Sequence, residues 1–150
     1  AASVATVSGT GKVKTTSNMT FYGAALNITG LSFALAANTS YYFEFDLNHS
    51  STATAAGVWF GATYPAASTI TWMVTQMLTA ATQSTFYSEG AIFTSAAGAT
   101  GAVVNGTQPA KLTGSISTLG AGTLQLQVKS ELAGGRGIVK AGSGGRIYEE

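Results

Sequence analysis

Cysteine is absent from this sequence, and histidine occurs once, as His49. The absence of cysteine excludes disulfides, thiolate nucleophiles and cysteine-ligated metals. A single histidine cannot form a multi-histidine metal site. Its neighbours Asp46 and Ser50 are close only in sequence, whereas the members of a catalytic triad are brought together by the fold. We therefore interpret His49 as a surface histidine, and the sequence predicts no catalytic residue, no metal site and no cofactor.

Charge is also scarce. Seven Lys and Arg residues stand against six Asp and Glu residues, and charged residues make up 9% of the chain. A nucleic-acid-binding protein needs a basic face, and a net charge of +1 does not supply one. No run of about 20 apolar residues is present to form a membrane-spanning helix. We expect neither nucleic acid nor a membrane as a partner.

The low charge also affects whether copies of the chain associate with one another. Hydrophobic residues make up 45% of the chain, so a core can be buried and the composition is not that of a disordered protein. Soluble monomers usually depend on surface charge to stay apart. A chain this neutral is expected to have much of its surface covered by partners, and the composition therefore favours an oligomer.

Short β-type runs are what the sequence does contain. Ser and Thr make up about a quarter of the 150 residues, and Gly contributes 19, which suits pleated strands and tight turns. The clearest strand covers residues 41–47, where apolar and polar side chains alternate with a period of two. The face expected to meet the core carries Tyr41, Phe43, Phe45 and Leu47. The opposite face carries Tyr42, Glu44 and Asp46.

Turn signals recur between runs of this kind, which is typical of a sandwich, jelly roll or barrel. Residues 70–78 and 123–130 alternate in the same way, and residues 27–30 are interpreted as a turn between two short strands. We predict an all-β, single-domain antiparallel fold over residues 14–150, a jelly-roll or a β-sandwich or barrel, with eight to ten short strands. Residues 1–13 are expected to form an N-terminal arm or an edge strand.

Two pairs of side chains could carry chemistry. Glu44 and Asp46 share one strand face, and the strand rise places their carboxylates about 6–7 Å apart. That spacing could suit a glycosidase pair or a calcium ion, although an exposed polar face is the simpler interpretation. Trp59 and Trp72 could stack on sugars, although positions in the core are the simpler interpretation.

Several short motifs follow one another in a recognisable order. Residues 37–45 read Ala-Asn-Thr-Ser-Tyr-Tyr-Phe-Glu-Phe and lead into a Thr/Ala-rich turn and a glycine at 52–57. The later pieces are Glu-Gly at 89–90, Gly-Thr-Leu-Gln-Leu at 122–126, Ser-Glu at 130–131 and Lys-Ala-Gly-Ser at 140–143. In this order they resemble a domain common in the virion structural proteins of tailed bacteriophages.

This resemblance covers roughly residues 30–150 and implies a small β-jelly-roll, often trimeric, on the virion surface, with no catalytic residues to transfer. It implies a capsid decoration or cement protein that is made in the host cytoplasm. Such a protein would bind the major capsid protein or another virion protein and stabilise the shell as a homotrimer. Val4 and Val7, in the N-terminal arm, are the candidate assembly contacts.

Two other interpretations stay open. The same type of domain is found at the end of head fibres and tail fibres, where it would act as a knob that binds a host-surface receptor. A polysaccharide-cleaving enzyme that uses Glu44 and Asp46 is the third interpretation.

Overall fold

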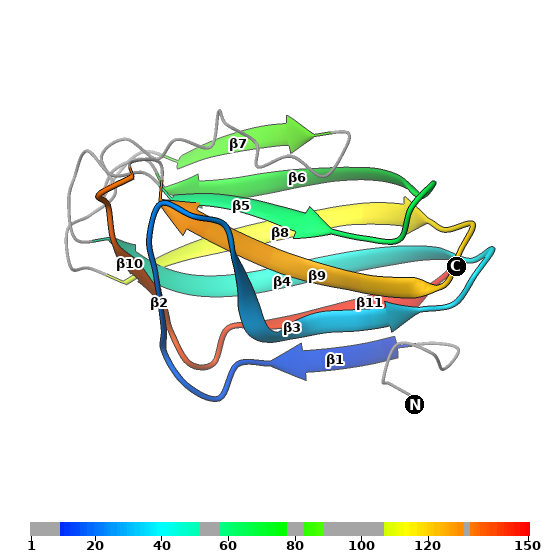
Figure 1. The fold of residues 1–150 in the computed structure, drawn as a ribbon, viewed down its shortest axis with the longest axis horizontal. Helices are drawn as coiled ribbons and strands as arrows, with labels where there is room; N and C mark the ends of the chain where they lie inside the picture. The colour runs from blue at the N-terminus through cyan, green and yellow to red at the C-terminus, as the bar shows by residue number, and fades with distance from the viewer. Residues whose placement is uncertain (1–9, 52–57, 78–82, 89–106, 131–132) are drawn as a thin grey trace.

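Two antiparallel β-sheets pack against each other as a sandwich (Figure 1). A computed structural model describes residues 10–51, 58–77, 83–88, 107–130 and 133–150. The strands of this part are β1 (Thr10–Lys14), β2 (Met19–Phe21), β3 (Leu26–Leu35), β4 (Ser40–Ser51), β5 (Val58–Thr63), β6 (Thr69–Met77), β7 (Gln83–Ser88), β8 (Gln108–Ser117), β9 (Gly122–Ser130), β10 (Gly137–Val139) and β11 (Gly144–Glu149). The predicted all-β antiparallel fold is confirmed in its sandwich form. Eleven strands are assigned in the described part of the chain, against eight to ten expected, and β1, which covers the end of the predicted arm or edge strand, lies at the edge of its sheet.

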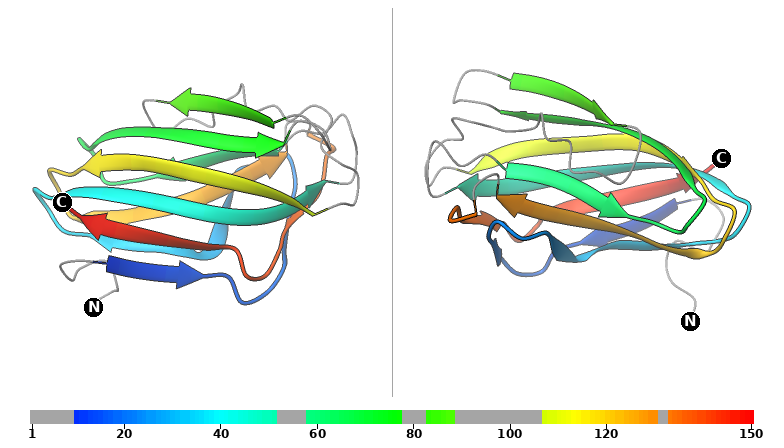
Figure 2. Two further views of the ribbon diagram at one scale, coloured as in Figure 1. Left: turned by 180° about the vertical axis from the view of Figure 1, so that it is seen from behind. Right: turned by 45° about the horizontal axis from the view of Figure 1, so that its top comes forward.

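The larger sheet has eight strands, and six of them lie side by side in the order β1-β11-β4-β8-β6-β7. Short strand β10 pairs with both β2 and β4 and completes this sheet. The smaller sheet has the order β3-β9-β5. Seen from behind, the larger sheet presents one broad face, which we call the outer face, while its other side meets the smaller sheet (Figure 2, left).

The core lies between the two sheets, and β4 shows why. The four side chains expected to face inward, Tyr41, Phe43, Phe45 and Leu47, are all buried. The ring of Phe45 lies 5.8 Å from that of Phe33 on the opposite sheet, measured between centroids. The predicted alternation of this strand is therefore confirmed, and its aromatic side joins the sheets.

A glycine on β8 makes room for two of the largest core side chains. Gly114 lies directly opposite Phe43 on one side and Trp72 on the other. A Cβ at Gly114 would lie 2.8 Å from Phe43 Cζ and 2.7 Å from Trp72 Cβ, closer than carbon atoms pack. The absence of a side chain at this position is thus a packing requirement.

Residues 27–30 do not form the expected turn, because β3 runs through them. The pairing of β3 with β9 shifts between Asn27 and Ser32, as in a β-bulge. Gly30 adopts a φ of +91° within this shift, which accounts for the turn-like composition. The bulge also changes the phase of the strand, so that Ile28 and Leu31 are both buried although they are three residues apart.

Candidate functional site

The outer face of the larger sheet carries the exposed side chains of its central strands. Strand pairing aligns them in rows, because residues in register on neighbouring strands point to the same side. In one row Tyr42 of β4 lies between Tyr148 of β11 and Ser115 of β8. In the next row Glu44 lies between Arg146 and Thr113. This face therefore brings together side chains that are more than 100 positions apart in the chain.

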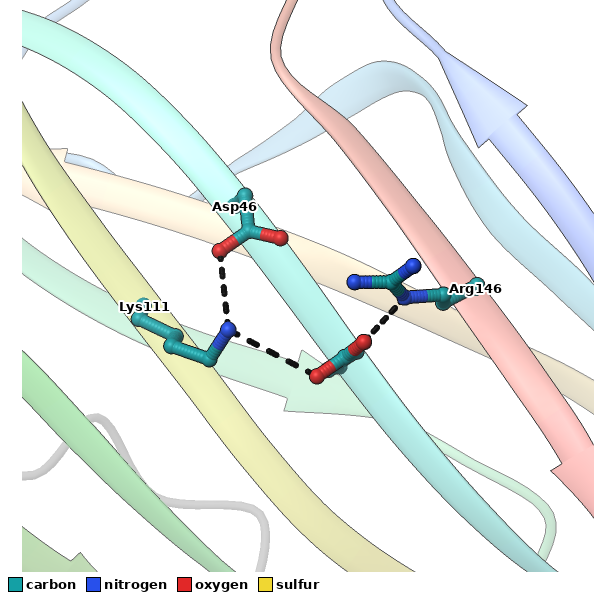
Figure 3. A network of polar contacts seen from close by, with 4 residues as sticks. Asp46, Lys111 and Arg146 are labelled. Carbon is teal, nitrogen blue, oxygen red and sulfur yellow. Dashed lines mark hydrogen bonds and ion pairs between the residues drawn. The ribbon is translucent and has the colours of Figure 1, made fainter.

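Four charged side chains form a network at the centre of this face (Figure 3). Lys111 Nζ lies 3.3 Å from Asp46 Oδ1 and 3.6 Å from Glu44 Oε2. Arg146 Nε donates to Glu44 Oε1, and this contact raises the pKa of the Arg146 guanidinium. The two carboxylates singled out in the sequence are thus held by two cations from the neighbouring strands β8 and β11.

The two carboxylates are ion-paired and border different hollows. Glu44 borders a groove on one side of the network, whereas Asp46 borders a separate hollow on the other side. A glycosidase needs both carboxyl groups to flank one scissile bond. The geometry favours the interpretation of Glu44 and Asp46 as members of a surface ion network.

The groove beside Glu44 has a volume of about 480 Å³. Long side chains border it and short hydroxyl side chains form its floor. The bordering residues are Tyr42, Tyr148 and Met73, which are 54%, 38% and 47% exposed, and the floor residues are Thr71, Thr113 and Ser115. We call this feature the Tyr42 groove.

The hollow beside Asp46 has a volume of about 500 Å³ and a different character. Gly144, opposite Asp46, has no side chain to fill it, and Lys12, Lys14 and Arg146 surround it together with Asp46. Cations outnumber carboxylates in its lining, in contrast to the Tyr42 groove.

His49 is fully buried. The prediction of a surface histidine is therefore wrong. It belongs to the inward-facing residues of β4, and its ring meets that of Phe60 edge-on at 5.5 Å. Within the described residues neither ring nitrogen has a hydrogen-bond partner, and burial lowers the pKa of His49 to about 4. Asp46 lies on the opposite face of the same strand, so Asp46, His49 and Ser50 do not assemble into a triad. The polar residues around His49 suggested an exposed loop. In the structure β4 continues through them to Ser51, and this places His49 on the inward face of the strand.

The two tryptophans occupy different environments. Trp72 is buried in the core, as expected. Trp59 is half-buried on β5, and the Lys129 ammonium lies 4.9 Å from its ring centroid, within the range of a cation–π contact. Trp59 is therefore covered by a lysine rather than packed between the sheets.

The described residues contain neither a candidate metal site nor a membrane-spanning helix. Among the described residues, no group of three or more His, Cys, Asp or Glu side chains could hold a metal ion. In the same part of the chain no helix is long and apolar enough to cross a membrane. Val4 and Val7, the candidate assembly contacts, lie outside the described residues.

Sequence reasoning missed the Tyr42 groove as a unit. The alternation along β4 and β6 does predict that Tyr42 and Met73 point outward. Their approach to Tyr148 depends on the pairing of β4 with β11 and with β8, and of β8 with β6. A local pattern contains no signal for pairings at such separations.

Comparison with known proteins gives only distant similarity. No family model and no curated protein sequence matches the chain. Among solved structures, the VP2 subviral particle of infectious bursal disease virus matches with 9% identity and a TM-score of 0.30, over 93% of this chain and 40% of that chain. The Gx strain of the same virus matches with 14% identity and a TM-score of 0.25, over 92% of this chain and 35% of that chain. TM-scores this low carry no argument about function, and the chain spans well under half of these proteins.

Proposed function

We propose that this chain is a structural protein of a tailed-bacteriophage virion, a decoration protein that binds the capsid surface as a homotrimer and stabilises the shell. The observation that carries the proposal is the ordered set of motifs at residues 37–45, 122–126 and 140–143. The low charge of the chain supports it, because a neutral surface suits a protein that works among many partners.

The motif residues that resemble the phage domain hold the fold together. Asn38 adopts a φ of +53° in the turn before β4, and the Tyr41 hydroxyl accepts a hydrogen bond of 2.9 Å from the Ala36 N–H. Ser143 is fully buried, and its hydroxyl accepts a 3.0 Å hydrogen bond from the Asn48 N–H. The resemblance is therefore one of scaffold, and the role of the domain depends on its surfaces.

Association into a trimer is supported by the exposed apolar side chains as well as by the resemblance. Large apolar side chains outside the Tyr42 groove, such as Tyr22, Leu26 and Leu119, are exposed. A closed cyclic trimer could bury side chains of this kind without leaving an end that grows into fibres. The number three comes from the resemblance alone.

The proposal is tested on purified protein and on particles that lack it. Light scattering should give three times the chain mass of 15.1 kDa at micromolar concentration. Added protein should sediment with undecorated shells, saturate at hundreds of copies per particle and raise the temperature at which the shells open. A monodisperse monomer would contradict the trimer, and failure to sediment with shells would contradict the decoration role.

A fibre knob that binds a host-surface receptor is the second candidate, and the Tyr42 groove is the observation that favours it. The copy number per particle separates the two roles, since a few copies indicate a fibre and hundreds indicate the shell. In either role we propose that the chain is not an enzyme, because Glu44 and Asp46 border different hollows. Polysaccharide hydrolysis that disappears in Glu44→Gln would contradict this proposal.

A further inference from the structure

The Tyr42 groove lies in the middle of the larger sheet, where the backbone offers nothing to a ligand. Its floor strand β8 is paired along its length with β4 on one side and β6 on the other. A peptide that adds to a sheet needs an unpaired strand edge for its main-chain hydrogen bonds. Recognition in this groove must therefore depend on side chains.

Those side chains combine aromatic faces with hydroxyl groups. Tyr42 and Tyr148 lie side by side across β4 and β11, and both are substantially exposed. A hydrogen bond with the Glu150 carboxylate, and the charge of that group, raise the pKa of Tyr42. On the floor, the hydroxyls of Thr71 and Ser115 lie 3.3 Å apart. Two exposed aromatic side chains therefore lie beside hydroxyl groups, each of which can both donate and accept a hydrogen bond.

The charge of the groove is balanced. Among its lining residues the carboxylate is that of Glu44, and this group is paired with Arg146 and Lys111. Among the lining residues a cationic or anionic ligand therefore finds no uncompensated opposite charge, and the Glu150 carboxylate beside Tyr42 is not part of the lining. The carboxylate oxygens retain lone pairs that can accept hydrogen bonds from hydroxyl groups.

We infer that the Tyr42 groove binds a neutral sugar, one or a few pyranose rings of a glycan. A pyranose presents an apolar C–H face that stacks on an aromatic ring, and its rim of hydroxyls matches the Thr71, Thr113 and Ser115 floor. The groove volume of about 480 Å³ lies within the ordinary range of small-molecule sites. This inference does not depend on whether the protein decorates a shell.

The test uses the whole protein and four neutral sugars, glucose, galactose, mannose and N-acetylglucosamine, with short linear oligomers of each. Saturation-transfer NMR and calorimetry at millimolar sugar should show binding of at least one series. Tyr42→Ala and Tyr148→Ala should each weaken that binding about tenfold, as the loss of a stacking partner does. Tyr22→Ala is the matched control, because Tyr22 is 55% exposed against 54% for Tyr42 and does not line the groove. It should leave the affinity unchanged.

Three results would overturn the inference. The first is no binding by any sugar of the panel, and the second is an equal loss of binding in the Tyr22 variant. The third is a change of molecular mass in Tyr42→Ala or Tyr148→Ala by light scattering, which would identify the groove as a contact between copies. Thermal unfolding of each variant separates a lost site from a lost fold. Since shell binding is measured separately, failure here leaves the decoration proposal standing.

Discussion

His49 is a titratable side chain held uncharged inside an apolar core. The residues beside it, Phe60 from β5, Gln108 opposite it on β8 and Val139 opposite it on β10, carry no charge. Protonation would place an uncompensated cation between the two sheets, which is costly. The stability of the protein must therefore depend on pH through this residue.

The sign of this dependence follows from the two pKa values. The folded protein binds the proton only near pH 4, whereas the unfolded chain binds it near 6.5. The contribution of neutral His49 is fully present above pH 6.5 and is lost as the pH falls toward 4. We expect a loss of about 3 kcal/mol in the free energy of unfolding across this window.

Chemical denaturation of the parent protein and of His49→Phe between pH 7 and pH 4 measures this loss. The parent should lose stability relative to the variant as the pH falls, because the variant retains an aromatic ring without a proton site. Since His49 is the sole histidine of the chain, its NMR signals report the folded pKa directly. Parallel stability curves, or a folded pKa near 6.5, would contradict the buried neutral assignment.

At the scale of the element, successive side chains of β4 point alternately to the core and to the outer face. Phe43 is buried between the sheets, and its neighbour Tyr42 is 54% exposed on the outer face. We expect Phe43→Ala to lower the free energy of unfolding by about 3–5 kcal/mol, because it leaves a cavity in the core. Tyr42→Ala, the control on the same strand, should cost under about 1 kcal/mol. Urea titration of both variants measures these losses in the free energy of unfolding. Similar losses would contradict the alternation of buried and exposed residues along β4.

Strand β8 allows a second comparison within one element and its following turn. Gly114→Ala places a methyl group against Phe43 and Trp72, and overpacking of this kind costs about 1–3 kcal/mol. Gly120→Ala is the matched control, because nothing lies within 4 Å of the added carbon. Thermal unfolding should show a lower midpoint for the first variant alone. Equal midpoints would mean that the two side chains and the Thr71 carbonyl, whose oxygen lies closest to the added carbon, move aside freely.

The sequence predicted the individual strands and their inward faces better than it predicted the surface features that arise when the strands pair. Period-two alternation identified the inward faces of β4, β6 and β9, because burial on one side of a sheet is a local property. It failed at residues 27–30, where a bulge resembles a turn, and at His49, where a polar residue lies in an inward position. The Tyr42 groove depends on pairing between β4 and β11, and that pairing is fixed by the whole fold.

At the scale of the whole molecule, the N-terminal arm is the part assigned to assembly. Under the decoration proposal, Val4 and Val7 pack on a neighbouring copy or on the shell, and each full burial contributes about 1.5–3 kcal/mol. Replacing both with Ala should weaken shell binding measured by sedimentation. The double variant Ser3→Ala with Ser8→Ala is the control and should bind like the parent. Unchanged affinity after deletion of residues 1–7 would show that the arm anchors nothing.

The pairing of β1 with β11 has a mechanical consequence. Thr10 lies beside Tyr148 at one end of this pair, and Lys14 lies beside Gly144 at the other. A pulling force applied to Thr10 and Tyr148 would load the hydrogen bonds between the two strands one after another, starting from that end. Such bonds yield at low force, whereas strands sheared along their length resist together. Tension between these two points would detach β1 first. The inner strands would bear the force only after β1 has separated from β11.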